Sequence, residues 1–425
     1  MSDHKDKRMR ACVIGAGAAG LCAARHLSQY QSVFTFDVYE KTAKVGGVWN
    51  YTDSVGLDTN GLPIHTSLYR NMRTNIPMEI MEFQDFASNC ETSFVSHTRV
   101  LQYLEDYAKH FNLYQYIKFN HQIISVSRSE NVWKIMVKNI TTGEISEHIY
   151  DSVFVCNGKF SIPFIPTDIK GLHTFKGQVL HTHDYRVADG FEGKVVLVLG
   201  GGPSGVDISI EVSEIAKQVI FCHRNAEPFL NLSESIVQEL SEIHEITETG
   251  VELKNGNQYK VNTILLATGY QLDLSFLDKS CAINVTNSGR VEGIYLHFIN
   301  QTYPSMAIWA ICRTPIPFPY YHIQVSLFIK YLTRELELPS IEEMESHIQR
   351  ELSYRKSMGL SERHCNKISQ SSYDYCHTLT QMANIKPLSP VVNKLHDDIQ
   401  EFRKQDIIGY KNMNFSIISD EQYCI

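Results

Sequence analysis

Two stretches of the chain share one pattern of apolar and polar positions. Each has a short apolar run, a Gly-x-Gly-x-x-Gly turn, and then small and apolar residues suited to a helix; the first runs from Ala11 to Leu21 and the second from Val195 to Asp207. The apolar run predicts a buried strand, and the residues after the turn predict a helix. The sequence therefore predicts two strand–turn–helix units that each hold a dinucleotide pyrophosphate at a helix N-terminus.

The same reading predicts the other main elements. Strands are expected over 34–40, 153–158, 219–222, 263–269 and 306–312, a hairpin over 117–137 followed by a strand after the Thr142-Gly143 turn, and helices over 97–113 and 320–336. Ser340 and Glu343 form a capping box that begins another helix. The tail after Lys356 is polar and carries no signal that we can interpret.

These elements predict an α/β fold with two dinucleotide-binding, Rossmann-like domains of three layers. The second glycine-rich unit lies mid-chain, and Pro163 and Pro166 mark a crossover into it. We therefore expect a discontinuous first domain, residues 1–166 and 281–425, with the second domain, 167–280, inserted into it. The C-terminal helices belong to the last segment.

The residues that follow the second strand of each unit differ in charge. Glu40 ends the first of these strands about 20 residues beyond the turn, where an acid accepts ribose hydroxyls. The corresponding strand of the second unit ends in His223-Arg224-Asn225, and a cation in place of an acid favours NADP over NAD. The alternatives are a solvated glutamate and an exposed arginine with no special role.

Two turns between these units also bear on ligand binding. Gly46 and Gly47 precede Trp49 and allow backbone to pass close to a ligand. Asn75 precedes an Ile76-Pro77 bond, which excludes the α region for Ile76 and places Asn75 on a bent segment. By default such an asparagine is only a turn former.

Composition narrows the function classes. The 425 residues carry a formal net charge of −8, which argues against nucleic acid as partner. No signal peptide is visible, and no apolar run approaches the roughly 20 residues of a membrane span, so we expect a soluble protein without a membrane anchor, cytoplasmic unless a leader was removed. The ten cysteines form no Cys-x-x-Cys pair, and we expect no metal site or redox dithiol. A homo-oligomer stays open.

The most specific string is Phe175-x-Gly-x-x-x-His181-x-x-x-Tyr185, between the two units. The chain resembles the flavin-containing monooxygenases from about Ala11 to Gln324. The resemblance rests on this string together with both glycine turns, Glu40, Gly46-Gly-x-Trp49, the 69–77 segment, 103–111 and Ala267-Thr-Gly-Tyr270. Related Baeyer–Villiger enzymes carry tryptophan where this chain has Tyr185. We expect the chain to lack the C-terminal anchor of the vertebrate branch, and it looks closer to soluble insect enzymes that N-oxygenate plant alkaloids.

The resemblance implies two cofactors, FAD and NADP(H), and assigns residues to each. The residues that it implies for FAD are Gly15, Ala16, Gly17, Ala18, Ala19, Gly20, Glu40, Gly47, Val48, Trp49, Thr74 and Gln324. Those that it implies for NADP(H) are Gly200, Gly202, Pro203, Ser204, Gly205 and Arg224. It makes Asn75 the catalytic residue that faces the flavin and keeps the oxygenated form intact, while His181 pins the linker rather than acting as an acid or base.

The implied reaction begins when NADPH reduces FAD, after which O2 adds to give a C4a-hydroperoxyflavin that passes one oxygen to a soft nucleophile. The expected substrate is a small molecule with a tertiary amine nitrogen, as in alkaloids, or a sulfide. A Baeyer–Villiger or N-hydroxylating enzyme, and a flavin- and NADP-binding redox sensor without turnover, are the alternatives. A disulfide reductase would need the cysteine pair that the chain lacks.

Overall fold

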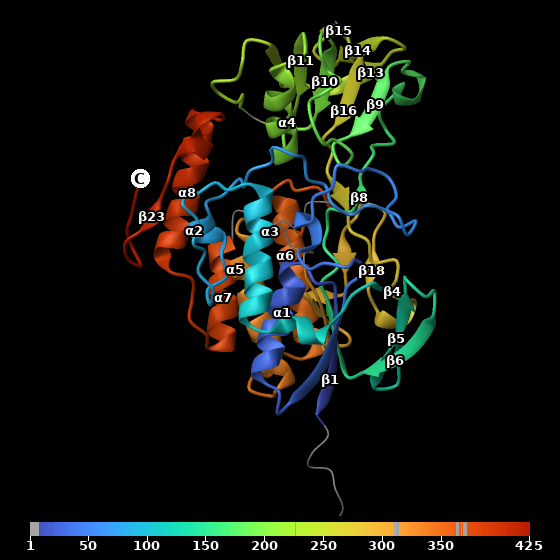
Figure 1. Cartoon of the computed structure of the whole chain (residues 1–425), viewed down its shortest axis with the longest axis vertical. Coiled ribbons are helices and arrows are strands. Elements are labelled where there is room, and N and C mark those ends of the chain that lie inside the picture. The colour runs from blue at the N-terminus through green and yellow to red at the C-terminus, as the bar shows by residue number, and fades with distance from the viewer. Residues whose placement is uncertain are drawn as a thin grey trace, which may run out of the picture.

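The computed structural model describes residues 8–225, 227–309, 311, 314–362, 365, 366, 368 and 372–425, and two sheets organise it (Figure 1). The larger has the order β20-β21-β22-β7-β1-β2-β3. β1 (Met9–Ile14) lies inside it and pairs in parallel with β2 (Phe34–Tyr39) and β7 (Ser152–Val155). The remaining strands are β3 (Ile117–Lys118), β20 (Ile294–Tyr295), β21 (Ile299–Asn300) and β22 (Met306–Ile308).

Alternate residues of β1 face two different apolar layers, since side chains alternate along a strand. Ala11 and Val13 pack with the helices α1 (Ala18–Gln29), α3 (His97–His110) and α5 (Pro317–Leu332). Cys12 and Ile14 pack with the small antiparallel sheet of β4 (His121–Ser129), β5 (Val132–Asn139) and β6 (Ile145–Tyr150). This gives the first lobe three layers.

The second lobe repeats this plan. Its sheet, in the order β12-β11-β10-β16-β9, is parallel throughout and consists of β9 (Gln178–His181), β10 (Val195–Leu199), β11 (Gln218–Cys222), β12 (Ile236–Glu239) and β16 (Thr263–Leu266). Helix α4 (Pro203–Ser213) packs on one face. The antiparallel strands β13 (Ile243–Ile246), β14 (Gly250–Leu253) and β15 (Gln258–Lys260) pack on the other. The expected α/β fold with two three-layer, Rossmann-like units is confirmed.

The two lobes are joined by a short antiparallel pair. β8 (Ile162–Pro163) leaves the first lobe, and β17 (Tyr270–Gln271) returns beside it. Residues beyond β17 already pack on the first lobe, because the backbone N–H of Asp278 donates to Val126 O at 2.8 Å. We therefore propose that the inserted domain ends near Gly269, about ten residues before the expected boundary.

Several element boundaries differ from the expectations. Ile117 belongs to the large sheet, and the hairpin begins at His121. The strand expected over 306–312 ends at Ile308, while 310 and 312 lie outside the described residues. Helix α5 begins at Pro317, which suits the first helical turn because proline lacks the N–H that would have no partner there. Most residues of this helix are buried.

The tail without an interpretable signal is folded. The capping box at Ser340 begins α6 (Ile341–Ser357) as expected, and the tail forms α7 (Ser372–Ala383), α8 (Pro390–Gln405) and the paired strands β23 (Ser416–Ile417) and β24 (Tyr423–Cys424). Helix α8 buries Val391, Leu395 and Ile399, an apolar stripe four residues apart.

The described chain also has two short helices and two short strands, besides 3-10 turns at Leu113–Tyr116, Leu172–Thr174, Lys279–Cys281 and Gly409–Asn412. The short helices and strands are α2 (Met78–Met81), the 3-10 turn Gly47–Trp49, and the antiparallel pair β18 (Asn284–Val285) and β19 (Val291–Glu292). None of the helices in the described ranges combines the length and apolar character that a membrane crossing requires.

Candidate cofactor and oxygenation site

The first glycine turn joins β1 to α1 through close backbone contacts. Gly15 has φ +99°, and a Cβ placed on it would lie 2.6 Å from Cys156 O. A Cβ on Gly20 would lie 1.8 Å from Gly15 O. Gly17 is the N-cap of α1 and carries no side chain to cap the helix. The turn therefore presents backbone N–H groups and the positive helix end, which suits a pyrophosphate.

Glu40 lies beside this turn rather than in solvent. Its side chain is buried, Oε2 accepts a hydrogen bond from Ala16 N at 2.8 Å, and Oε1 accepts from Thr42 N at 2.9 Å. A carboxylate held at the end of β2 by backbone donors is oriented before a ligand arrives. Its remaining lone pairs suit ribose hydroxyls.

The Gly46–Trp49 segment lies against the same turn. Gly46 N donates to Ala16 O at 2.9 Å, and a Cβ on Gly47 would lie 3.0 Å from Gly17 Cα. Gly46 and Gly47 both have positive φ, so glycine is needed for this approach. The two glycine segments together form one backbone-lined cradle.

The second turn has the same geometry at α4. Gly200 has φ +124°, and a Cβ on it would lie 2.4 Å from Ala267 O. A Cβ on Gly205 would lie 1.8 Å from Gly200 O. Gly202 is the N-cap, nothing described lies within 4 Å of its ideal Cβ, and Pro203 follows at the first helical position. This second cradle, with Ser204 in its first turn, is open in front of the helix N-terminus and can take an anion.

Two cations stand beyond the second cradle. The exposed side chain of Arg224 lies with Nη1 3.5 Å from Glu242 Oε1, and Lys254 Nζ pairs with the other oxygen of the same carboxylate. Both cations lower the pKa of Glu242. Sequence reasoning found Arg224 but missed Lys254 and Glu242, because both lie outside the local β10–β11 pattern.

Asn75 lies on a segment that connects the two lobes. Tyr69 OH donates to Asp207 Oδ2 at 2.7 Å, and Asn71 Nδ2 donates to Glu211 Oε1 at 2.8 Å, so the segment is fixed to α4. Asn75 itself sits on a bend before Pro77, as expected, and is half-buried. Within the described ranges its amide makes no hydrogen bond. A polar side chain in this state is available to a ligand.

Comparison with known proteins decides the family. The model of the flavin-binding monooxygenase-like family matches residues 7–237, more than half of the chain. The chain belongs to this family. FAD and NADP(H), the cofactors that the resemblance implied, are those of the family.

Individual relatives cover nearly the whole chain. "Flavin-containing monooxygenase FMO GS-OX1" of Arabidopsis thaliana is 32% identical over 88% of this chain and 85% of that protein. "Senecionine N-oxygenase" of Tyria jacobaeae is 27% identical over 97% of this chain and 91% of that protein. The solved structure of S-allyl-L-cysteine S-oxygenase from Allium sativum superposes with a TM-score of 0.88 at 25% identity, covering 96% of each chain.

Two residues that the family resemblance assigned to FAD have protein partners here. Thr74 is buried, and its hydroxyl accepts from Val95 N at 3.2 Å. Gln324 is buried on α5, and its amide donates to Tyr375 OH at 2.7 Å. Both contacts hold the lobe together, and a further contact of either residue with the flavin stays a prediction.

The residue directly after the family string has a structural role that sequence reasoning missed. Arg186, directly after Tyr185, is buried and donates only to backbone carbonyls: Thr52 O at 2.8 Å, His183 O at 2.7 Å and Ser54 O at 3.1 Å among them. This guanidinium fixes the loop after Trp49 against the second lobe. The signal that could have revealed this role was the position of the arginine directly after the string.

His181 anchors the linker, as the sequence analysis expected. Its Nδ1 accepts from His183 N at 3.0 Å, and its Nε2 lies 3.1 Å from Gly269 O. This pattern requires a neutral ring with its proton on Nε2. Burial, followed by the neighbouring His183, lowers the pKa of His181 to about 4.

The protein should therefore lose stability as the pH falls from about 6.5 toward 4, because the unfolded state binds the His181 proton more readily than the folded state. Burial lowers the pKa of His183 in the same direction. His181→Gln keeps a donor toward Gly269 but cannot titrate. We expect the melting temperature of this variant to fall less steeply over that range, and equal slopes in wild type and variant would contradict the role.

Proposed function

We propose that the protein is an FAD-containing monooxygenase that uses NADPH and O2 to oxygenate a soft nucleophile in a small molecule. The observation that carries this proposal is the pair of glycine cradles, at the ends of β1 and β10, with the Asn75 segment bonded to the helix of the second cradle. We assign FAD to the cradle beside Glu40 and NADP(H) to the cradle beside Arg224. These assignments agree with the family membership.

The reaction balances as NADPH, H⁺, O2 and a tertiary amine giving NADP⁺, water and the amine N-oxide. Bound reduced flavin supplies the activation of O2. The residues of the chain would bind and orient the cofactors: the two turns would hold the pyrophosphates, Glu40 would hold a ribose, and the Asn75 amide would offer a hydrogen-bond donor to the flavin. No general acid or base on the protein is required for oxygen transfer to a lone pair.

Two soft nucleophiles are candidates. The alignment with an N-oxygenase covers 97% of the chain, which supports a tertiary amine nitrogen of the alkaloid type as the first candidate. The S-oxygenase structure that superposes over 96% of the chain supports a sulfide as the second. Both atoms offer a polarisable lone pair, so one site can serve either.

The test is a product assay on the purified holoenzyme with NADPH and ¹⁸O2. N,N-dimethylaniline, methyl phenyl sulfide and cyclohexanone serve as the amine, sulfide and ketone. We expect labelled N-oxide or sulfoxide in a one-to-one ratio with NADPH consumed. A lactone from the ketone would favour the Baeyer–Villiger alternative. NADPH consumed only to peroxide, or not at all, would contradict monooxygenation.

Arg224 gives a prediction for coenzyme choice. Arg224→Ala should raise KM for NADPH roughly tenfold, about 1.4 kcal/mol, and leave KM for NADH unchanged, because only the 2′-phosphate needs the guanidinium. Glu242→Gln should lower KM for NADPH, since it releases Arg224 and Lys254 from their present partner.

Lys260→Ala is the matched control, because Lys260 is an exposed lysine of the same lobe on β15. The measurement is KM for NADPH and for NADH, determined by steady-state kinetics for all three variants. If Arg224→Ala raised both KM values equally, the arginine would not read the 2′-phosphate.

A further inference from the structure

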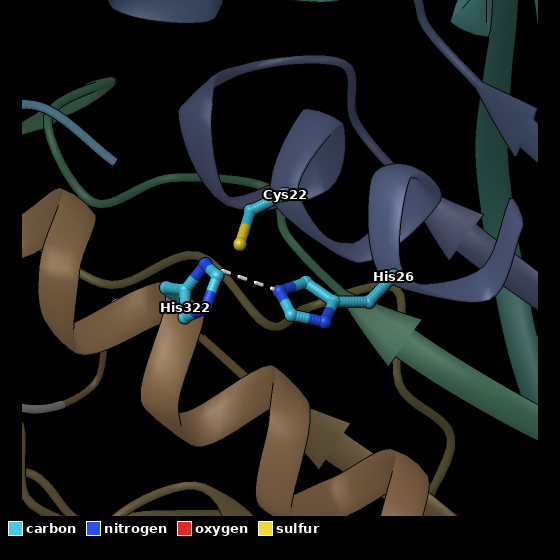
Figure 2. A group of neighbouring side chains, drawn as sticks. All are labelled: Cys22, His26 and His322. Carbon is cyan, nitrogen blue, oxygen red and sulfur yellow. Dashed lines mark hydrogen bonds between the residues drawn. The ribbon is translucent and has the colours of Figure 1, made fainter. Parts of the chain in front are cut away.

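Three side chains that commonly bind metal ions meet between α1 and α5 (Figure 2). Cys22 and His26 are one helical turn apart on α1, and His322 projects from α5 toward them. Cys22 Sγ and one nitrogen of each histidine all lie within 4.8 Å of one another. Cys22 and His26 are buried, and the side chain of His322 is 18% exposed.

The spacing of the two imidazoles suits a tetrahedral ion. His26 Nε2 lies 3.3 Å from His322 Nδ1. Two nitrogens bound to one tetrahedral zinc at ~2.0–2.1 Å are separated by about 3.3–3.4 Å. The same distance permits a weak N–H···N hydrogen bond, so the orientation of the rings matters.

Ser326, one turn beyond His322, indicates that orientation. Its hydroxyl donates to His322 O at 2.7 Å, and its oxygen lies 3.5 Å from His26 Nδ1. Because the hydroxyl hydrogen is already used, Ser326 Oγ can only accept from a protonated Nδ1. This leaves the lone pair of His26 Nε2 directed toward His322. Metal-bound histidines have an outer hydrogen-bond acceptor of this kind.

A carboxylate lies beside this cluster, next to His322. Asp85 Oδ1 lies 3.7 Å from His322 Nδ1, is buried, and accepts no hydrogen bond from any described residue. Its other oxygen lies 3.2 Å from Arg25 Nε. Arg25 is thus the cation that faces the cluster, and its charge is shared with Asp85 and with the ring of Phe111, 4.0 Å away.

We propose that Cys22, His26 and His322 bind one Zn²⁺ that fastens α1 to α5, with the fourth position taken by water or by the neighbouring Asp85 carboxylate. A thiolate and two imidazoles suit zinc, whereas Mg²⁺ and Ca²⁺ take oxygen ligands. This departs from the expectation that the chain has no metal site. The role of the ion would be structural. Helix α1 begins at the first glycine turn, and the ion would hold this helix against α5.

Binding releases one proton: the Cys22 thiol loses its hydrogen to solvent as the sulfur–zinc bond forms.

The first test uses the purified full-length holoenzyme after removal of metal with a chelator. Titration with Zn²⁺ against a chromogenic competitor should give one ion per chain with submicromolar affinity and a higher melting temperature. Co²⁺ should give a thiolate-to-metal charge-transfer band and intense visible bands of four-coordinate cobalt, in a difference spectrum against the zinc-loaded protein, which subtracts the flavin. Absence of binding, or a six-coordinate spectrum without the charge-transfer band, would overturn the proposal.

Substitutions at the proposed ligands test whether the ion binds at this site. Cys22→Ser and His322→Phe should each lose the cobalt charge-transfer band or weaken zinc binding at least tenfold. Cys376→Ser, which changes another buried cysteine, on α7, should keep both. His322→Phe changes a partly exposed position and so provides the answer if Cys22→Ser fails to fold. Unchanged binding in His322→Phe would show that the ion sits elsewhere and refute the site.

Discussion

Replacing Asn75 with alanine should separate NADPH consumption from product formation. We expect oxygenated product to fall about 100-fold while NADPH oxidation continues and hydrogen peroxide accounts for the difference. The physical reason is the loss of the hydrogen-bond donor that we propose for the flavin, since removing one such donor costs on the order of 10²–10³ in rate at comparable sites. The amide is available for this task because it makes no hydrogen bond within the described ranges.

The measurement is the ratio of product to peroxide per NADPH, with flavin content checked by absorbance. Asn89→Ala is the control, since Asn89 is an exposed asparagine outside this segment. It should keep the wild-type ratio. Equal ratios in Asn75→Ala and wild type would remove Asn75 from the catalytic role.

Gly205→Ala should abolish reduction by NADPH without removing the flavin. A Cβ at this position would lie 1.8 Å from Gly200 O, so the turn between β10 and α4 has to open and the phosphate cradle loses its shape. We expect the rate of anaerobic flavin reduction by NADPH to fall at least 100-fold. The cradle that we assign to FAD is built on the other sheet and should remain filled.

Dithionite provides the internal control, because it needs no coenzyme site and should reduce both proteins alike. Gly202→Ala is the milder companion: its methyl group meets no described atom within 4 Å, so the turn survives and the affinity for NADPH should drop by a smaller factor. Loss of flavin in Gly205→Ala would mean that the second cradle, rather than the first, holds it.

The local parts of the site could be predicted from the sequence. The strand–turn–helix units at Gly15 and Gly200, the carboxylate at Glu40 and the bend at Asn75 each depend on neighbours within about 25 residues. Such features follow from the period of apolar residues and from the glycine and proline positions. The partner of His181, by contrast, is Gly269 O, 88 residues further along the chain.

The contacts that complete the site could not be predicted, because they join segments that no local pattern relates. Lys411 Nζ donates to Asp207 Oδ2 at 2.7 Å from a tail that carried no interpretable signal, and both side chains are largely buried. Arg73 likewise donates to Asn412 Oδ1, across more than 300 residues. These bonds fix the Asn75 segment and α4 to the same turn of the tail, Gly409–Asn412.

The sequence by itself determined the two dinucleotide cradles, because backbone shape at a glycine turn is a local property. The tertiary structure alone decided which charges and ligands face one another: Glu242 between Arg224 and Lys254, Asp207 beside Lys411, and His322 beside Cys22 and His26. Those pairings depend on how sheets and helices pack, and packing places side chains together without regard to their distance along the chain.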